Sequence, residues 1–167
     1  MNSAAHIPGS QGDNGKAKGV MENDWHSHPF VRGMSADLLK TLAACAMPAA
    51  FEADQLIFRE GEIANRFYLL IEGHVQLEAE ADDRPGVPVD QVGAGDVLGW
   101  SWLFPPYTWN FTARTIEPVK AVFFYGTWLR ERTETDPVLG YELMKRTAVV
   151  LMRRLQATRQ QLVRVAG

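Results

Sequence analysis

The feature that most constrains this chain is a series of short β-prone segments separated by turn residues. The segments are AAFEADQLIFREGE, RFYLLIEGHVQLEAEA and VPVDQVGAGDVLG, and the residues that divide them are Asp54, Gly61, Gly73 and Gly95. Short strands at this spacing are typical of an all-β barrel or jelly roll rather than of alternating β and α units. We therefore predict a mainly β fold with flanking helices, whose barrel covers about residues 48–125.

Two further stretches add detail to the barrel. In ADDRPGVP, Pro85 and Gly86 predict a hairpin loop. The stretch FTARTIEPVKAVFF predicts a second pair of strands, with Pro118 in the turn between them.

A helix is predicted before the barrel. Ser35 is a candidate N-cap with Asp37 in the first turn, and ADLLKTLAACA repeats apolar residues at helical spacing until Pro48 ends the pattern. Residues 1–24 are rich in small and polar residues without apolar periodicity, so we expect a disordered tail. The folded domain should span residues 25–167.

The last third of the chain returns to helical periodicity, over about residues 126–164. A short helix is expected from Thr127 to about Thr133. Asp136 followed by Pro137 is a typical N-cap and first helical residue, and the next helix can run unbroken to about Val163.

An apolar stripe follows this long helix at alternating spacings of four and three residues. Its members are Met144, Ala148, Leu151, Leu155, Thr158 and Leu162. This a/d rhythm predicts a seam that faces a partner helix. The alternative is that the stripe packs on the chain's own barrel, but the helix is longer than a small barrel can cover, which favours a homodimer.

Composition excludes several classes of protein. The 167 residues are 46% hydrophobic, enough for one domain with a core, and the net charge is -3, so there is no overall basic footprint for nucleic acid. From Val138 onward the sequence contains six basic residues but a single acidic one, Glu142. We interpret this basic run as a solvated helix face. No apolar run approaches the roughly 20 residues that cross a bilayer, and no secretory signal is present. We expect a cytoplasmic protein with no membrane contact.

The order of these motifs resembles the cyclic-nucleotide-binding domain of the Crp/Fnr type. The resemblance covers about residues 28–164 and depends on the EGE at Glu60–Glu62, on RFYLLIEGHVQLE and on GAGDVLG, with the glycine landmarks Gly61, Gly73, Gly95 and Gly99 in order. It implies a jelly roll, a long C-terminal dimerisation helix and a dimeric sensor of a small ligand. A downstream protein partner would detect the change that the ligand causes.

The segment GDVLGWSWLFPPYTWNFTART departs from the family's phosphate-binding cassette. The resemblance implies a ribose-binding glutamate after Gly99 and an arginine for the cyclic phosphate, but this chain has Trp100 at the first position and Trp109, or Asn110 with a shifted gap, at the second. Loss of a charge-assisted contact to phosphate would cost about 1.5–3 kcal/mol. Binding of cAMP or cGMP is therefore in question.

Other candidate ligand contacts remain. By resemblance Thr112 lies beside the phosphate and Thr158 contacts the base, while Arg159 or Arg114 could supply a displaced positive charge, although Arg114 is expected at the surface. The whole candidate set is Gly99, Trp100, Ser101, Trp102, Trp109, Asn110, Thr112, Thr158 and Arg159. The aromatic cassette leaves three alternatives open: a pocket for a flatter and less anionic ligand, a retained cyclic nucleotide, or a pocket filled by its own tryptophans in a structural or adaptor domain.

Catalysis and metal binding have little support in the sequence. The single cysteine, Cys45, lies in an apolar helical run and is expected to be inert, and no nucleophile and base stand at motif spacing. His26 and His28 near Asp24 are a weak metal signal, so we predict neither a metal site nor an enzyme. No helix-turn-helix follows the long helix in this sequence, and we expect no sequence-specific DNA binding.

Overall fold

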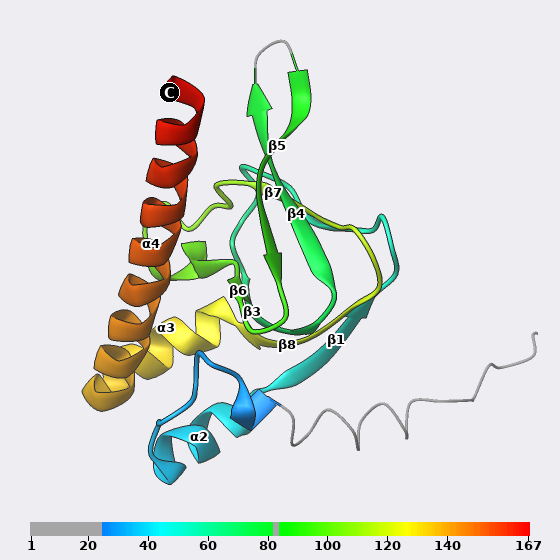
Figure 1. The fold of residues 1–167 in the computed structure, drawn as a ribbon. Coiled ribbons are helices and arrows are strands. Elements are labelled where there is room, and N and C mark those ends of the chain that lie inside the picture. The colour runs from blue at the N-terminus through cyan, green and yellow to red at the C-terminus, as the bar shows by residue number, and fades with distance from the viewer. Residues whose placement is uncertain (1–24, 82–83) are drawn as a thin grey trace, which may run out of the picture.

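The computed structural model describes residues 25–81 and 84–167. The predicted disordered tail, residues 1–24, lies outside the described residues. Two antiparallel four-stranded sheets form the jelly roll that the sequence predicts (Figure 1). The strands are β1 (Met47–Phe51), β2 (Leu56–Phe58), β3 (Arg66–Glu72), β4 (His74–Ala81), β5 (Arg84–Gly93), β6 (Val97–Leu98), β7 (Thr112–Thr115) and β8 (Val119–Tyr125). The first sheet has the order β1-β8-β3-β6 and the second β2-β7-β4-β5.

Two expectations about strand pairing are wrong. β7 and β8 are consecutive in the chain but do not pair with each other, because the chain passes from one sheet to the other between them; β7 pairs with β2 and β4, and β8 with β1 and β3. The hairpin loop is also shorter than predicted. β5 starts at Arg84, so Pro85 and Gly86 belong to the strand.

The helices largely follow their predicted signals. They are η1 (Trp25–Ser27), α2 (Ala36–Ala43), η2 (Trp100–Leu103), α3 (Gly126–Thr135) and α4 (Pro137–Ala166). The N-caps at Ser35 and Asp136 are confirmed: their side-chain oxygens accept the N-H groups of Leu38 and Leu139. The expectation that Pro48 ends α2 is wrong, because α2 already ends at Ala43 and Pro48 lies in β1.

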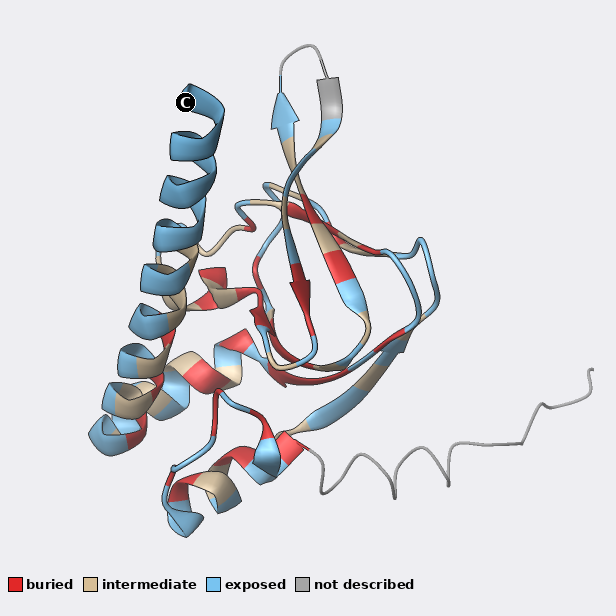
Figure 2. Cartoon of the chain, viewed as in Figure 1, coloured by how far each residue is buried: buried red, intermediate tan, exposed pale blue. Residues whose placement is uncertain are grey.

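The long helix α4 packs on the rest of the molecule as far as Arg154. Its buried residues are Leu139, Leu143 and Thr147, and the rest of the helix extends beyond the helical layer as an exposed rod (Figures 1 and 2). None of the helices within the described ranges is long and apolar enough to cross a membrane.

Two hydrophobic cores lie on opposite faces of the first sheet. Strand β3 shows the division, because alternate residues point to opposite faces. Phe67 and Leu69 join a core with α2, α3 and α4, whereas Tyr68 and Leu70 join the core between the two sheets. The barrel therefore has its own interior, and the helices cover it from outside (Figure 2).

A buried histidine fastens the N-terminal segment to the barrel. His28 Nδ1 accepts the N-H of Phe30, and Nε2 lies 3.2 Å from the carbonyl oxygen of Asp96, in the turn before β6. With Nδ1 as acceptor, the proton belongs on Nε2, which donates to that carbonyl. Burial lowers the pKa of His28 below its ordinary value of 6.5, so the folded protein holds the ring neutral.

The buried neutral ring predicts that acid destabilises the fold through His28. The unfolded chain takes up a proton near pH 6.5, above the lowered pKa of the folded state, so this contribution to stability is present above 6.5 and is lost as the pH falls below it. His28→Gln should cost about 1–3 kcal/mol at neutral pH and flatten this dependence. Urea unfolding at a series of pH values measures both effects. The exposed His26→Gln is the control, and an equal pH dependence in both variants would contradict the assignment.

Candidate functional site

The cassette forms the link between β6 and β7. After β6, Gly99 takes a left-handed backbone conformation with φ 87°, and the four residues of η2 follow it. An extended loop then leads through Tyr107 and Trp109 to β7. Backbone bonds fix this loop against the β2–β3 connection: Trp109 donates its N-H to Glu62 and its carbonyl oxygen accepts the N-H of Gly61, both at 2.9 Å.

Trp109 fills the interior of the cassette. Its indole stacks on Phe58 with ring centroids 3.9 Å apart and 11° between the planes, and only 4% of the residue is exposed. The Gly99 backbone lies directly against the indole, since a Cβ added there would come within 2.7 Å of Trp109 Cζ3. The indole therefore takes up the space between Gly99 and Phe58.

Little space remains beside this ring. The cavity between the cassette and the second sheet measures about 10 Å³, close to the volume that one water molecule needs. Five of the predicted residues border it: Gly99, Trp100, Ser101, Trp109 and Asn110. The only side-chain hydrogen bond between them in the described structure joins two neutral groups, with Asn110 Nδ2 donating to Ser101 Oγ at 3.0 Å. This volume is far below the about 300 Å³ or more of pockets that hold small organic ligands.

The other predicted ligand residues lie elsewhere in the described structure. Trp102 is fully buried in the helix-side core, where its Nε1 finds no acceptor within the part of the chain described. Thr112 Oγ1 is already engaged by the N-H of Glu60 at 3.0 Å. Thr158 and Arg159 lie on the exposed half of α4, and the hydroxyl of Thr158 donates to the carbonyl of Arg154.

Arg154 is the cation that the sequence reasoning missed. Its half-buried guanidinium borders the cassette cavity, and Nη2 donates to the carbonyl oxygen of Val97 at 2.8 Å. Desolvation lowers its pKa, while Asp90 and Asp96 act in the opposite direction. The sequence feature that could have identified Arg154 is its position one helical turn before Thr158, a predicted ligand contact. Arg114, by contrast, lies on the outside of the second sheet, 3.7 Å from Asp54 and 3.8 Å from Glu78.

The cysteine and histidines that were considered for catalysis or metal binding are not arranged for either role in the described residues. Burial raises the pKa of the Cys45 thiol to about 12, which keeps it out of its nucleophilic thiolate form. Across residues 25–81 and 84–167, no three His, Cys, Asp or Glu side chains gather as a metal site. His26 is exposed, His28 is bonded as described, and Asp24 lies outside the described residues.

The contact between Gly99 and Trp109 leads to a prediction about stability. Gly99→Ala should destabilise the protein by more than the about 1–2 kcal/mol of a left-handed backbone alone, because the methyl group meets the indole. Gly61→Ala is a matched control, since Gly61 has φ 83° and a methyl group added there meets nothing within 4 Å. Urea unfolding of both variants, and of Gly99→Ala combined with Trp109→Ala, measures the coupling. Equal losses for Gly99→Ala and Gly61→Ala would contradict the close contact.

The comparisons with known proteins agree with this architecture. The family model described as cyclic nucleotide-binding domain matches residues 48–135. A CRP-like cAMP-activated global transcriptional regulator of Mycobacterium tuberculosis is 28% identical over 131 residues, which are 78% of this chain and 57% of that protein. The chain thus spans little more than half the length of this relative.

Solved structures show the same fold. A putative cyclic nucleotide-binding protein from Geobacter metallireducens is 32% identical with a TM-score of 0.69, over 75% of this chain and 91% of that one. The c-di-GMP responsive regulator CLP of Xanthomonas campestris is 22% identical with a TM-score of 0.63, over 79% of this chain and 65% of that one. The chain belongs to the cyclic nucleotide-binding domain family, in its Crp/Fnr type.

Proposed function

We propose that this protein is a dimeric, non-catalytic regulatory domain whose cassette is filled by its own Trp109 and takes no cyclic nucleotide. Its family and fold support a ligand-sensing regulatory domain in general terms. The narrower proposal concerns how this chain uses the fold. A downstream protein partner, rather than bound DNA, detects its state.

The stack of Trp109 on Phe58 is the observation that carries the proposal. A nucleobase or ribose entering the cassette would have to displace an indole that is held by a ring contact at 3.9 Å and by two backbone hydrogen bonds. Moving such a buried ring into water costs several kcal/mol. A ligand would have to recover this free energy before it bound at all.

The polar groups of the cassette do not compensate for that cost. Trp100 lacks an acceptor for a ribose hydroxyl, and Ser101 and Asn110 are neutral groups bonded to each other. The guanidinium of Arg154 is nearby, but it is already bonded to the carbonyl of Val97. An anionic phosphate would therefore enter a site with neither room nor an available charge.

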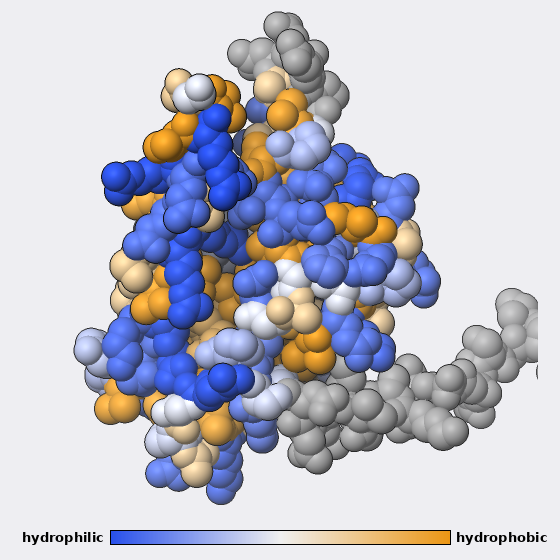
Figure 3. All heavy atoms as spheres, in the orientation of Figure 1, coloured by the Kyte–Doolittle hydropathy of each residue, from blue (hydrophilic) through white to orange (hydrophobic). Residues whose placement is uncertain are grey.

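The exposed stripe on α4 supports the dimer. Met144 is 45%, Leu155 71% and Leu162 66% exposed, and Ala148 also faces solvent. Only Leu151 is half-buried among the apolar members. Figure 3 shows apolar patches between charged side chains along this helix. Large apolar side chains in heptad positions gain stability when a second helix covers them.

The titration of wild-type protein with cAMP and with cGMP tests the filled cassette. We expect no heat of binding up to millimolar nucleotide. Trp100→Glu with Trp109→Arg should create measurable affinity, because the pair restores a hydroxyl acceptor and a phosphate partner and removes the indole. Isothermal titration calorimetry checks both expectations.

A control variant distinguishes the effect of an open cavity from the effect of an added positive charge. Trp100→Glu with Trp109→Ala opens the cavity without adding a cation, and it should bind about tenfold more weakly than the arginine variant. Circular dichroism establishes that each variant is folded. Micromolar binding of cAMP or cGMP by the wild-type protein would refute the proposed closure.

The dimer has a separate prediction. Leu151→Glu with Leu155→Glu should give a monomer, because four carboxylates would meet in an apolar seam. Sedimentation velocity measures the mass. Val163→Glu with Val165→Glu adds the same charge to the same helix outside the a/d stripe and should leave the dimer intact. An unchanged mass for the seam variant, or a monomeric wild-type protein, would contradict the assignment.

A further inference from the structure

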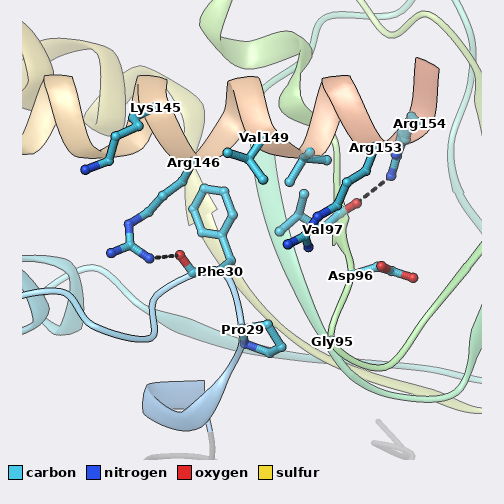
Figure 4. Close-up of a pocket in the computed structure, with 11 residues that line it drawn as sticks. Pro29, Phe30, Gly95, Asp96, Val97, Lys145, Arg146, Val149, Arg153 and Arg154 are labelled. Carbon is cyan, nitrogen blue, oxygen red and sulfur yellow. Dashed lines mark hydrogen bonds between the residues drawn. The ribbon is translucent and has the colours of Figure 1, made fainter. Parts of the chain in front are cut away.

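A second and much larger cavity lies between α4 and the barrel. Its walls are residues 145–154 of α4, residues 29–30 of the N-terminal segment and residues 95–97 in the turn before β6, and its volume is about 380 Å³ (Figure 4). We call it the α4 pocket. This volume lies within the range of small-molecule sites, about 300–1,000 Å³, whereas the cassette cavity does not.

The α4 pocket combines an apolar surface with several cations. Its apolar side chains are Phe30, Val97, Val149 and Val150. Its charged side chains are Lys145, Arg146, Arg153 and Arg154, with Asp96 as the carboxylate among the lining residues. Apolar walls with a few convergent charges are the usual composition of a ligand site.

Most of these charges already have partners. Lys145 and Arg146 both bind Glu142, at 2.9 and 3.1 Å, and Arg146 Nη1 also donates to the carbonyls of Phe30 and Arg32. These bonds lower the pKa of Glu142 and hold it ionised. They also fix one end of the pocket, because they join α4 to the N-terminal segment.

The opposite end is fixed as well. Arg154 donates to the carbonyl of Val97, as described above. The carboxylate of Asp96 accepts the N-H of Gly93 at 2.9 Å, which stabilises the turn. Both contacts hold the turn before β6 in place beside α4.

Arg153 is the exception among the four cations. It makes no hydrogen bond or ion pair to any residue that the structure describes, and its side chain extends from α4 into the pocket in Figure 4. The guanidinium borders the same cavity as Phe30 and Val149, and none of its five N-H donors is bonded to a described residue. An anion at this point would meet an unpaired charge without displacing an existing contact.

The partner helix of the proposed dimer would not fill the α4 pocket. Successive residues of an α-helix are about 100° apart, so Arg153 lies about half a turn around α4 from Leu151 and Leu155. The stripe and the pocket are on different faces. A dimer formed through the stripe leaves the pocket accessible.

We propose that the α4 pocket binds a small organic anion, in which one acidic group pairs with Arg153 and an apolar body packs on Phe30, Val149 and Val150. The acidic group is a carboxylate, sulfonate or phosphate, each of which matches the two parallel donors of a guanidinium. This site is separate from the cassette and does not depend on the cassette being closed. Its ligand would act on α4 directly, and through Arg154, which borders both cavities, on the cassette.

Two fluorescent probes of similar shape test the site. The anion 1-anilinonaphthalene-8-sulfonate has an apolar body and one acidic group, and N-phenyl-1-naphthylamine is its uncharged counterpart. We expect saturable binding of the sulfonate to the wild-type protein, weakened at least about tenfold in Arg153→Ala. The uncharged probe should bind both proteins with equal affinity. Arg164→Ala, which removes an exposed cation from the same helix, should change neither affinity.

A second variant reduces the volume of the α4 pocket and leaves Arg153 in place. Val149→Trp fills the pocket and should weaken both probes, while circular dichroism shows that the helix is retained. Equal sulfonate affinity in wild-type and Arg153→Ala proteins, or no saturable binding by the wild-type protein, would overturn the proposal. The wild-type protein could instead sediment with phosphatidylglycerol vesicles, and Arg153→Ala could abolish this. The anion would then belong to a lipid, and the proposal of a free small ligand would be overturned. None of these results depends on cAMP or cGMP binding.

Discussion

The contact of Gly99 with the stacked pair Trp109 and Phe58 is the constraint on which the cassette depends. Only a residue without a side chain fits above the indole, where an added Cβ would also come within 2.9 Å of the carbonyl oxygen of Arg66. The same ring belongs to the core between the sheets, so one side chain serves the stability of the barrel and, in the proposed function, also excludes a ligand. In the proposed function, ligand recognition and core packing compete for this volume, and the indole occupies it.

The cassette is also tied to the helices. Trp102 and Trp109 are seven residues apart in the sequence but belong to different hydrophobic cores, on opposite faces of the first sheet. Arg130 of α3 donates to the carbonyl of Trp102 at 2.8 Å and lies 4.5 Å from the ring centroid of Tyr107. A shift of the cassette would therefore disturb both cores and the contact with α3. This arrangement gives the cassette a physical connection to α3.

Local signals in the sequence sufficed for much of the fold. The caps at Ser35 and Asp136, the long helix and the short strands follow from residue types and periodicity, and the glycine landmarks located the cassette. The partners of β7 and β8 could not be predicted in this way, because they are set by strands far away in the chain. Adjacent aromatic residues likewise gave no sign that Trp109 would point into the barrel and Trp102 away from it. The α4 pocket was missed because Phe30, Asp96 and Arg153 meet only in the folded chain.

The part of α4 that extends beyond Arg154 in each protomer has a mechanical consequence. The bond from Arg154 to Val97 is the last contact from this helix to the barrel among the hydrogen bonds of the described residues, and about 12 residues follow it. At about 1.5 Å per residue they form a lever about 18 Å long. A tilt of about 10° at Arg154 would move its tip by about 3 Å. A small rearrangement near the turn before β6 would thereby become a larger displacement at the end of α4, where the proposed protein partner could detect it.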